Sequence, residues 1–356
     1  MKNQKLNIFL AILLLLQIIF LKWISNQIEL VEIHYATAFY PFISNIFRFI
    51  FNLFKFSLGD VLYTLLALYI LYNLYKVIKN KRLFKFETFI KIAAFLSITL
   101  LIFNFLWGFN YYRKPLAQQL NIEKTTFTTN ELEVFAKKLI ADINKTHFKI
   151  TKNDTLKVEV PFKNDSIYML SVDGYLKLNA KYPFLSTPNL KVKNSMYSTA
   201  LSYMGFAGYL NPFTNESQVN NHIPSVSLIT TSSHELAHQI GFAAEYEANM
   251  LAYLATTNHN NLYFRYAGKF MALRYILNEL YIADENLYNQ YLNEINKGIL
   301  KNMEESNAFW EQYKNPFESF FKLFYDLFLK SNAQKDGIKS YKKVVGLMIN
   351  YSSKSK

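Results

Sequence analysis

Three apolar runs occupy most of the first 110 residues, and they constrain the fold more than any other feature of the sequence. A lipid bilayer offers the backbone no hydrogen-bond partners, so a segment that crosses it must form a helix or part of a closed barrel. Each run is about long enough to cross as a helix. We therefore predict membrane-spanning helices at residues 6–24, 61–78 and 88–109. A cleaved signal peptide is the alternative for the first run, but no small-residue cleavage site follows it.

The distribution of charge predicts how these helices are oriented. Residues 1–114 contain 13 Lys and Arg against 4 Asp and Glu, and so hold +9 of the net charge of +13. The densest basic cluster, at residues 76–85, lies between the second and third runs. By the positive-inside rule this loop and the N-terminus are cytoplasmic, and the third span delivers the rest of the chain to the other side. The charge thus indicates a lipid bilayer as partner and argues against nucleic acid.

Between the first two runs, residues 42–56 have the pattern of an amphipathic helix. Asn45, Arg48, Asn52 and Lys55 recur every three or four positions among Phe, Ile and Leu. One interpretation places this helix along the outer membrane surface, with its aromatic side chains in the acyl boundary. The other packs it against the spanning helices or the following domain.

Beyond residue 110 the pattern becomes that of a water-soluble domain, mainly helical with a small sheet. Thr128 and Glu131 form a capping box that begins a helix to about residue 147. Alternating apolar residues predict a strand at 155–162. A second strand is expected at 189–196, and a loop with an edge strand at 205–221. Further helices are predicted at 166–180, 262–280, 285–309, 316–330 and 337–351. The expected fold class is mainly α, with a three-helix transmembrane region (1–110) and an α+β domain (111–356).

The motif H-E-x-x-H, at His234, Glu235 and His238, is the arrangement with an obvious chemical use. On a helix, two histidines four residues apart project from one face as metal ligands, and the glutamate beside them can polarise a metal-bound water. The chain has no cysteine, so a zinc ion would be held by histidine and carboxylate. Gly241 stands where the helix would end, which allows a third ligand to fold back.

Two carboxylates, Glu245 and Glu247, compete for the place of the third ligand. Both lie just beyond the expected turn, in a stretch from residue 194 to 264 that contains no Lys or Arg. Such an acidic stretch is a plausible setting for a cation in an otherwise basic chain. The alternative is a solvated helix face on which these histidines and glutamates are ordinary surface residues.

The segment from Glu245 to Asn249 resembles the E-x-x-A-D/N signature of glutamate-type zinc peptidases. That resemblance implies Glu245 as the third zinc ligand and Asn249 as a residue that orients a ligand histidine. The six residues between His238 and Glu245 are fewer than those peptidases usually have, so Glu247 remains the alternative ligand.

The whole chain resembles an uncharacterised family of bacterial membrane proteins with a domain of unknown function, three N-terminal spans and an H-E-L-A-H-Q motif. The resemblance is carried by residues 57–60, 107–113, 208–214, 234–239, 245–249 and 336–341. It implies a zincin-like metallopeptidase domain that binds Zn²⁺, in a multi-pass protein of the bacterial inner (cytoplasmic) membrane with its C-terminal domain outside the cytoplasm.

The expected function is a membrane-anchored, zinc-dependent metallopeptidase that hydrolyses peptide bonds of envelope or exported substrates, with Glu235 as general base on a metal-activated water. Candidates for stabilising the oxyanion are Tyr263, Tyr266 and Arg274. Candidates for pairing with a peptide or protein substrate along an edge strand are Tyr209, Asn211 and Phe213. The alternative is a catalytically inactive zincin-like protein that binds peptides or has a structural role in the membrane.

Overall fold

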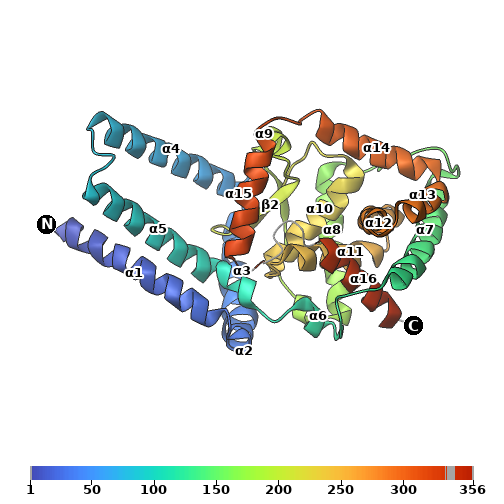
Figure 1. Ribbon diagram of the computed structural model, residues 1–356, viewed down its shortest axis with the longest axis horizontal. Coiled ribbons are helices and arrows are strands. Elements are labelled where there is room, and N and C mark those ends of the chain that lie inside the picture. The colour runs from blue at the N-terminus through green and yellow to red at the C-terminus, as the bar shows by residue number, and fades with distance from the viewer. Residues whose placement is uncertain (1, 333, 335–340, 355–356) are drawn as a thin grey trace. The chain divides into compact units, whose positions relative to one another are not determined.

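The computed structural model describes residues 2–332, 334 and 341–354, and these residues are mainly helical with a three-stranded sheet (Figure 1). The chain divides into two compact units. Unit 1 is Met1–Lys114 together with Asn211–Glu216, and unit 2 is Pro115–Leu210 together with Ser217–Lys356. The division after Lys114 lies close to the predicted one at residue 110, but the prediction did not include Asn211–Glu216 in the first unit.

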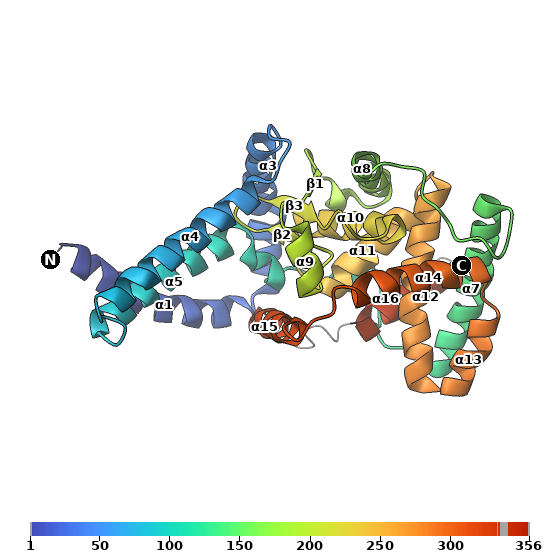
Figure 2. The ribbon, with the colours of Figure 1, turned by 90° about the horizontal axis from the view of Figure 1, so that it is seen from above.

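Three helices of unit 1 are long and apolar enough to cross a membrane. They are α1 (Lys2–Ile24), α4 (Leu58–Lys79) and α5 (Phe86–Leu106). Their positions agree with the predicted spans, except that α5 ends earlier than expected, where the 3-10 helix η2 (Gly108–Tyr112) follows. Helices α1 and α5 lie side by side (Figures 1 and 2).

The amphipathic segment of unit 1 forms α3 (Tyr40–Phe51), after α2 (Ile28–Val31) and the π-helix η1 (Glu32–Phe39). Its apolar side is exposed, which agrees with the first of the two interpretations. The helix ends at Phe51, earlier than the predicted residue 56. On its polar side Arg48 is fully buried and donates from Nη1 to Oδ1 of Asn215 at 2.7 Å, which agrees with the second interpretation, packing against protein. A buried guanidinium requires hydrogen-bond acceptors, and the 211–216 segment supplies one. The polar face of α3 therefore packs against protein.

The segment Asn211–Glu216 also contacts the first turn of α4. The carboxylate of Glu216 accepts hydrogen bonds from the backbone N–H of Leu58 at 3.2 Å and of Gly59 at 2.5 Å. A helix N-terminus presents unpaired N–H groups and a partial positive charge, which a carboxylate satisfies. The hydroxyl of Thr214 donates to the same carboxylate at 2.8 Å, so residues 57–60 and 211–214, which both carry the family resemblance, are joined through Glu216.

Unit 2 is built from helices. They are α6 (Leu116–Gln119), α7 (Thr129–Thr151), α8 (Asn164–Lys181), η3 (Pro183–Leu185), α9 (Ser198–Met204), α10 (Ser225–Ile240), α11 (Glu245–Thr257), α12 (Leu262–Ala283), α13 (Glu285–Asn293), α14 (Lys297–Glu311), α15 (Glu318–Ser331) and α16 (Tyr341–Lys354). Helix α10 packs against α8, α11 and α12, and α7 runs along α12 (Figure 2). The predicted helix at 285–309 is wrong as a single element, since it is divided into α13 and α14.

The sheet has the strand order β1-β3-β2, with β1 (Val192–Asn194), β2 (Gly208–Asn211) and β3 (Glu216–Val219). Strand β1 is parallel to β3, with Val192 opposite Ser217. Strands β2 and β3 are joined by a short loop, which only an antiparallel pair allows. The strand predicted within 189–196 and the edge strand predicted within 205–221 are confirmed as β1 and β2.

The strand predicted at 155–162 is wrong, because this segment is assigned no regular structure. Its backbone is satisfied by a side chain instead of a neighbouring strand. The N–H of Val158 donates to Oδ1 of Asn302 at 2.9 Å, and Nδ2 of Asn302 donates back to the Val158 carbonyl at 3.1 Å. A buried backbone group needs a partner of some kind, and here the amide of α14 provides it.

Other local predictions agree with the structure. The capping box of Thr128 and Glu131 begins α7. Helix α8 covers the predicted 166–180, and its Gly174 permits close packing, since a Cβ there would lie 3.1 Å from the carbonyl oxygen of Ala255. Residues 336–340 of the resembling segment lie outside the described residues, so the helix predicted from 337 is observed only from Tyr341.

Candidate metal centre

Helix α10 carries the H-E-x-x-H motif near its C-terminal end. Leu236 and Ala237, inside the motif, are fully buried, so this part of the helix belongs to the core of unit 2. The helix ends at Gly241, whose φ of +106° lies in the left-handed region that glycine adopts at little cost. After this turn, α11 begins at Glu245. The glycine predicted to end the helix is confirmed, and the chain reverses within a few residues.

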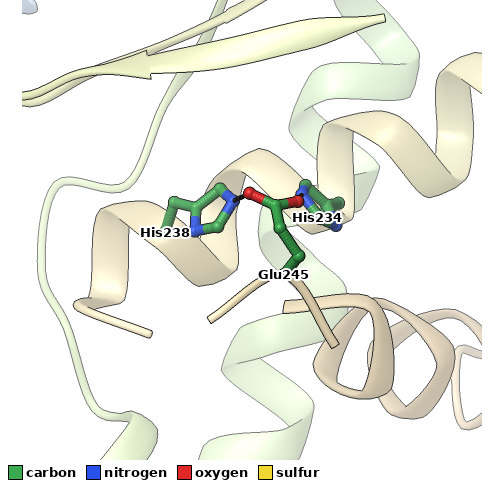
Figure 3. A group of neighbouring side chains, drawn as sticks. All are labelled: His234, His238 and Glu245. Atoms are coloured by element: carbon green, nitrogen blue, oxygen red, sulfur yellow. Dashed lines mark ion pairs between the residues drawn. The ribbon is translucent and has the colours of Figure 1, made fainter. Parts of the chain in front are cut away.

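The turn brings Glu245 between the two histidines (Figure 3). Its Oε2 lies 3.2 Å from Nε2 of His234, and its Oε1 lies 3.5 Å from Nε2 of His238. Zinc bonds of roughly 2.0–2.2 Å in a tetrahedral arrangement place ligand atoms roughly 3.3–3.6 Å apart. The three donor atoms all lie within 4.8 Å of one another. This donor set is therefore of the right kind and close to the right size for a zinc ion.

Both imidazole rings are held by their other nitrogen. Nδ1 of His238 lies 2.7 Å from the carbonyl oxygen of Phe242, and Nδ1 of His234 lies 2.9 Å from Oδ1 of Asn249. A carbonyl oxygen only accepts, so Nδ1 of His238 carries a proton, and Oδ1 of Asn249 has the same effect on His234. Neutral rings in this state direct the Nε2 lone pair toward the carboxylate. The resemblance to the glutamate-type signature implied this contact for Asn249.

A lone pair on Nε2 of His238 facing a carboxylate oxygen requires a positive charge between them. Without a metal, a proton supplies it. Burial is the largest single effect and lowers the pKa of His238, but the hydrogen bond to Glu245, the negative charges of Glu245 and Glu235 and the carbonyl of Phe242 together outweigh it and raise that pKa to about 9. Burial acts to raise the pKa of Glu245, whereas the hydrogen bonds from the two histidines hold it well below its usual range. The cluster thus favours a bound cation, either a proton or a metal ion.

Glu235 is almost fully buried beside this cluster. Its Oε2 has no hydrogen-bond partner among the described residues. Burial raises the pKa of Glu235 to about 7, although His234 and His238 act in the opposite direction and Glu245 adds to the rise. A carboxyl group with a pKa near neutrality is suited to accept and return a proton.

Strand β2 runs close to Glu235 because it has a glycine there. A Cβ on Gly208 would lie 2.8 Å from Oε1 of Glu235 and 2.8 Å from the carbonyl oxygen of Gln218. Neither distance leaves room for a side chain, so glycine permits this close approach. The hydroxyl of Ser217 in β3 also donates to the backbone carbonyl of Glu235, at 2.9 Å. The sheet therefore fixes the position of the motif glutamate.

Glu247, the alternative third ligand, lies elsewhere. Its carboxylate is buried and accepts a hydrogen bond from the backbone N–H of Leu116 at 2.7 Å, at the first residue of α6. It also accepts from the hydroxyl of Tyr246 at 3.3 Å. The structure places Glu245 beside the histidines and uses Glu247 to cap another helix.

The three residues predicted as oxyanion stabilisers are not brought to the centre. The hydroxyl of Tyr266 donates to Asn302 at 2.8 Å, Nη1 of Arg274 donates to Ser306 at 2.9 Å, and the ring of Tyr263 packs on Phe162. These contacts belong to the packing of α12 against α14 and the 155–162 segment.

A different phenol lies against the centre. The hydroxyl of Tyr325, in α15, donates to Oε1 of Glu245 at 2.7 Å. The sequence analysis missed Tyr325, because it lies 80 residues after Glu245 and no spacing rule connects the two.

The three residues predicted to pair with substrate do not lie together on one strand edge. Tyr209 lies in the edge strand β2. Asn211 is buried, and its Oδ1 accepts from the backbone N–H of Phe213 at 2.9 Å. The ring of Phe213 contacts Tyr63 of α4 edge to face. Asn211 and Phe213 thus build the segment that belongs to unit 1, and Tyr209 remains on the edge strand.

Over residues 35–349 the chain matches a family described as "Protein of unknown function (DUF3810)". The chain belongs to this family. The match includes α4, α5 and every residue of the candidate metal centre. No curated protein and no solved structure matches the chain. Membership of the family assigns no activity.

Proposed function

We propose that this protein is a membrane-anchored zinc metallopeptidase with a zincin-like domain of the glutamate type. The observation that carries the proposal is the cluster of His234, His238 and Glu245, with both Nδ1 atoms engaged and both Nε2 atoms turned toward one carboxylate. On an ordinary solvated helix face, the two nitrogens of a histidine ring would contact water. Here Nδ1 of each ring contacts an oxygen atom of the protein, and Nε2 of each ring faces the carboxylate of Glu245. Three protein ligands are the usual number in catalytic zinc sites, whereas structural sites use four.

The roles of the chain's own residues follow from their positions. A zinc ion bound by the three ligands would supply a Lewis acid that activates water and polarises a peptide carbonyl. Glu235 would take the proton of the attacking water and return it to the leaving amine, which suits its buried carboxylate. Asn249 and the carbonyl of Phe242 keep the imidazoles in the tautomer that binds metal. Tyr325 donates to Oε1 of Glu245, the oxygen that also faces His238, and so helps to hold this carboxylate in place.

The edge strand suggests how a peptide would bind. Strand β2 lies at an edge of the sheet and passes directly beside Glu235 at Gly208. An extended peptide that adds to such an edge would present its backbone carbonyls along the motif helix. Tyr209 is the predicted substrate-contact residue that remains on this strand.

The substrates we propose are peptides or proteins of the bacterial envelope or exported proteins. The basic loop between α4 and α5 favours a cytoplasmic position for that loop, which places the residues after α5 outside the cytoplasm. The second candidate function is a catalytically inactive peptide-binding protein, since the same oriented cluster would also bind zinc without turnover.

One experiment separates the two functions. The full-length protein, purified in detergent and loaded with zinc, is incubated with a complex peptide mixture, and new termini are identified by mass spectrometry. We expect cleavage by the parent and a loss of roughly 10²–10⁴-fold in Glu235→Gln, with zinc retained. Glu247→Gln is the matched control, since its amide oxygen still accepts a hydrogen bond, and it should cleave normally. Equal cleavage by Glu235→Gln would refute the proposal, and zinc binding with no cleavage by the parent would favour the inactive protein.

A further inference from the structure

Helix α15, with its N-cap residue Phe317, exposes a row of large apolar side chains, although the three candidate spans found among the described residues all lie in the other unit. Phe317, Phe320, Leu323, Phe324 and Leu327 are between 57% and 70% exposed. Elsewhere in the described part of unit 2, large apolar side chains are exposed singly or as a neighbouring pair. Isolated exposed residues need no explanation, whereas a contiguous apolar patch marks an interaction surface.

These five side chains share one face of the helix. With roughly 100° of rotation per residue, they fall within about a third of the helix circumference. The opposite side faces the protein, since Leu329 is fully buried, and Tyr325 packs edge to face on Phe206 with ring centroids 5.3 Å apart. Helix α15 is therefore apolar on two sides, of which only the inner one is covered by its own unit.

The charged residues of α15 form ion pairs with one another. Glu318 pairs with Lys322 at 2.5 Å, and Asp326 pairs with Lys330 at 2.6 Å. No other charged residue lies within Glu318–Ser331, so the helix is neutral overall. A helix with Phe and Leu on one face and charged residues away from that face can lie at the boundary between lipid headgroups and acyl chains.

We infer that the outer face of α15, formed by Phe317, Phe320, Leu323, Phe324 and Leu327, inserts into the surface of the bilayer that the same chain spans. The short link between α5 and unit 2 is the reason to expect the bilayer, and not another protein, to cover this face. Only residues 107–114 separate α5 from unit 2, a distance of at most roughly 30 Å when extended, so unit 2 never leaves the membrane surface. The bilayer is always beside unit 2, whereas a second copy of the chain could cover this face only at a sufficient protein concentration. The inference does not depend on the proposed peptidase activity.

The absence of cysteine from the chain allows a direct test. Single cysteines are introduced into the full-length protein, labelled with a nitroxide and reconstituted in lipid vesicles. Electron paramagnetic resonance then compares collisions with oxygen, which concentrates in lipid, and with a nickel chelate, which stays in water. Phe320→Cys is the test position, and Ser319→Cys is its matched control, since Ser319 is exposed on the adjacent side of the helix. Leu65→Cys in α4 and Met169→Cys in α8 are the lipid and water references.

We expect the label at Phe320→Cys to resemble that at Leu65→Cys, with an oxygen-to-nickel collision ratio several-fold above those at Ser319→Cys and Met169→Cys. Leu327→Cys, on the same face, should give the same result if the first variant folds poorly. A ratio like that of Met169→Cys would overturn the inference. Exclusion of both oxygen and the nickel chelate would also overturn the inference, because it would show that protein covers this face. Dipolar broadening between labels would then identify that protein as a second copy of the chain.

Discussion

Removing the side chain of Asn249 should weaken zinc binding without removing any ligand. Its Oδ1 lies 2.9 Å from Nδ1 of His234. The loss of a hydrogen bond of about 1–1.5 kcal/mol corresponds to about a tenfold change in affinity. The freed ring can also rotate and change tautomer, and the loss of such outer partners typically costs about 10–100-fold. We therefore expect Asn249→Ala to raise the zinc dissociation constant by about 10–100-fold.

The assay is competition for zinc between the full-length protein in detergent and a chromophoric chelator. Asn249→Asp retains an oxygen acceptor and should bind zinc about as tightly as the parent. Asn258→Ala is the control at the C-cap of the same helix, because the amide of Asn258 donates to the carbonyl oxygen of Leu254, away from the histidines. If Asn249→Ala bound zinc as tightly as Asn258→Ala, His234 would not be a zinc ligand oriented by Asn249.

Three further variants test neighbouring parts of the site. Glu247→Ala should keep zinc but lower the free energy of unfolding by about 1.5–3 kcal/mol, measured by chemical denaturation, because the buried N–H of Leu116 loses a charged acceptor. Gly208→Ala should slow cleavage about tenfold with zinc content unchanged, since its Cβ would displace Glu235 by about 0.6 Å and a 1 Å error costs about 10²-fold. Tyr325→Phe should weaken zinc binding about tenfold in the chelator assay.

Each of these variants has an outcome that would contradict it. Loss of zinc from Glu247→Ala would transfer the ligand role to that residue. For Gly208→Ala the control is Gly174→Ala, which crowds the carbonyl of Ala255 at 3.1 Å, remote from the motif carboxylate, and should affect stability without a selective loss of cleavage. Parent-like zinc affinity in Tyr325→Phe would show that its hydroxyl does not support the metal ligand.

The sequence predicted those helices and helix ends that depend on residues close together in the chain. The apolar runs gave the three long helices of unit 1, the capping box of Thr128 gave the start of α7, and Gly241 gave the end of the motif helix. The two histidines could be placed side by side because they are one helical turn apart, whereas the contact of Asn249 with His234 was implied by the resemblance to the E-x-x-A-D/N signature.

Features that depend on contacts between distant segments were not predictable in this way. Tyr325 reaches Glu245 from a helix far along the chain, and nothing in the spacing of residues indicates that contact. The burial of Arg48 depends on Asn215, and the irregular 155–162 segment depends on Asn302 of α14. A local pattern would suggest water as the partner of Arg48 and a neighbouring strand as the partner of residues 155–162. In the structure a side chain from a distant segment takes that place.

The metal content of the full-length protein is the most direct test of the central claim. The protein is purified without added chelator, and zinc is measured by mass spectrometry beside His234→Ala and Glu245→Ala. We predict about one zinc ion per chain in the parent and a loss of zinc in both variants, with the fold retained by circular dichroism. A parent that binds no zinc when offered it, or variants that bind as much as the parent, would contradict the account.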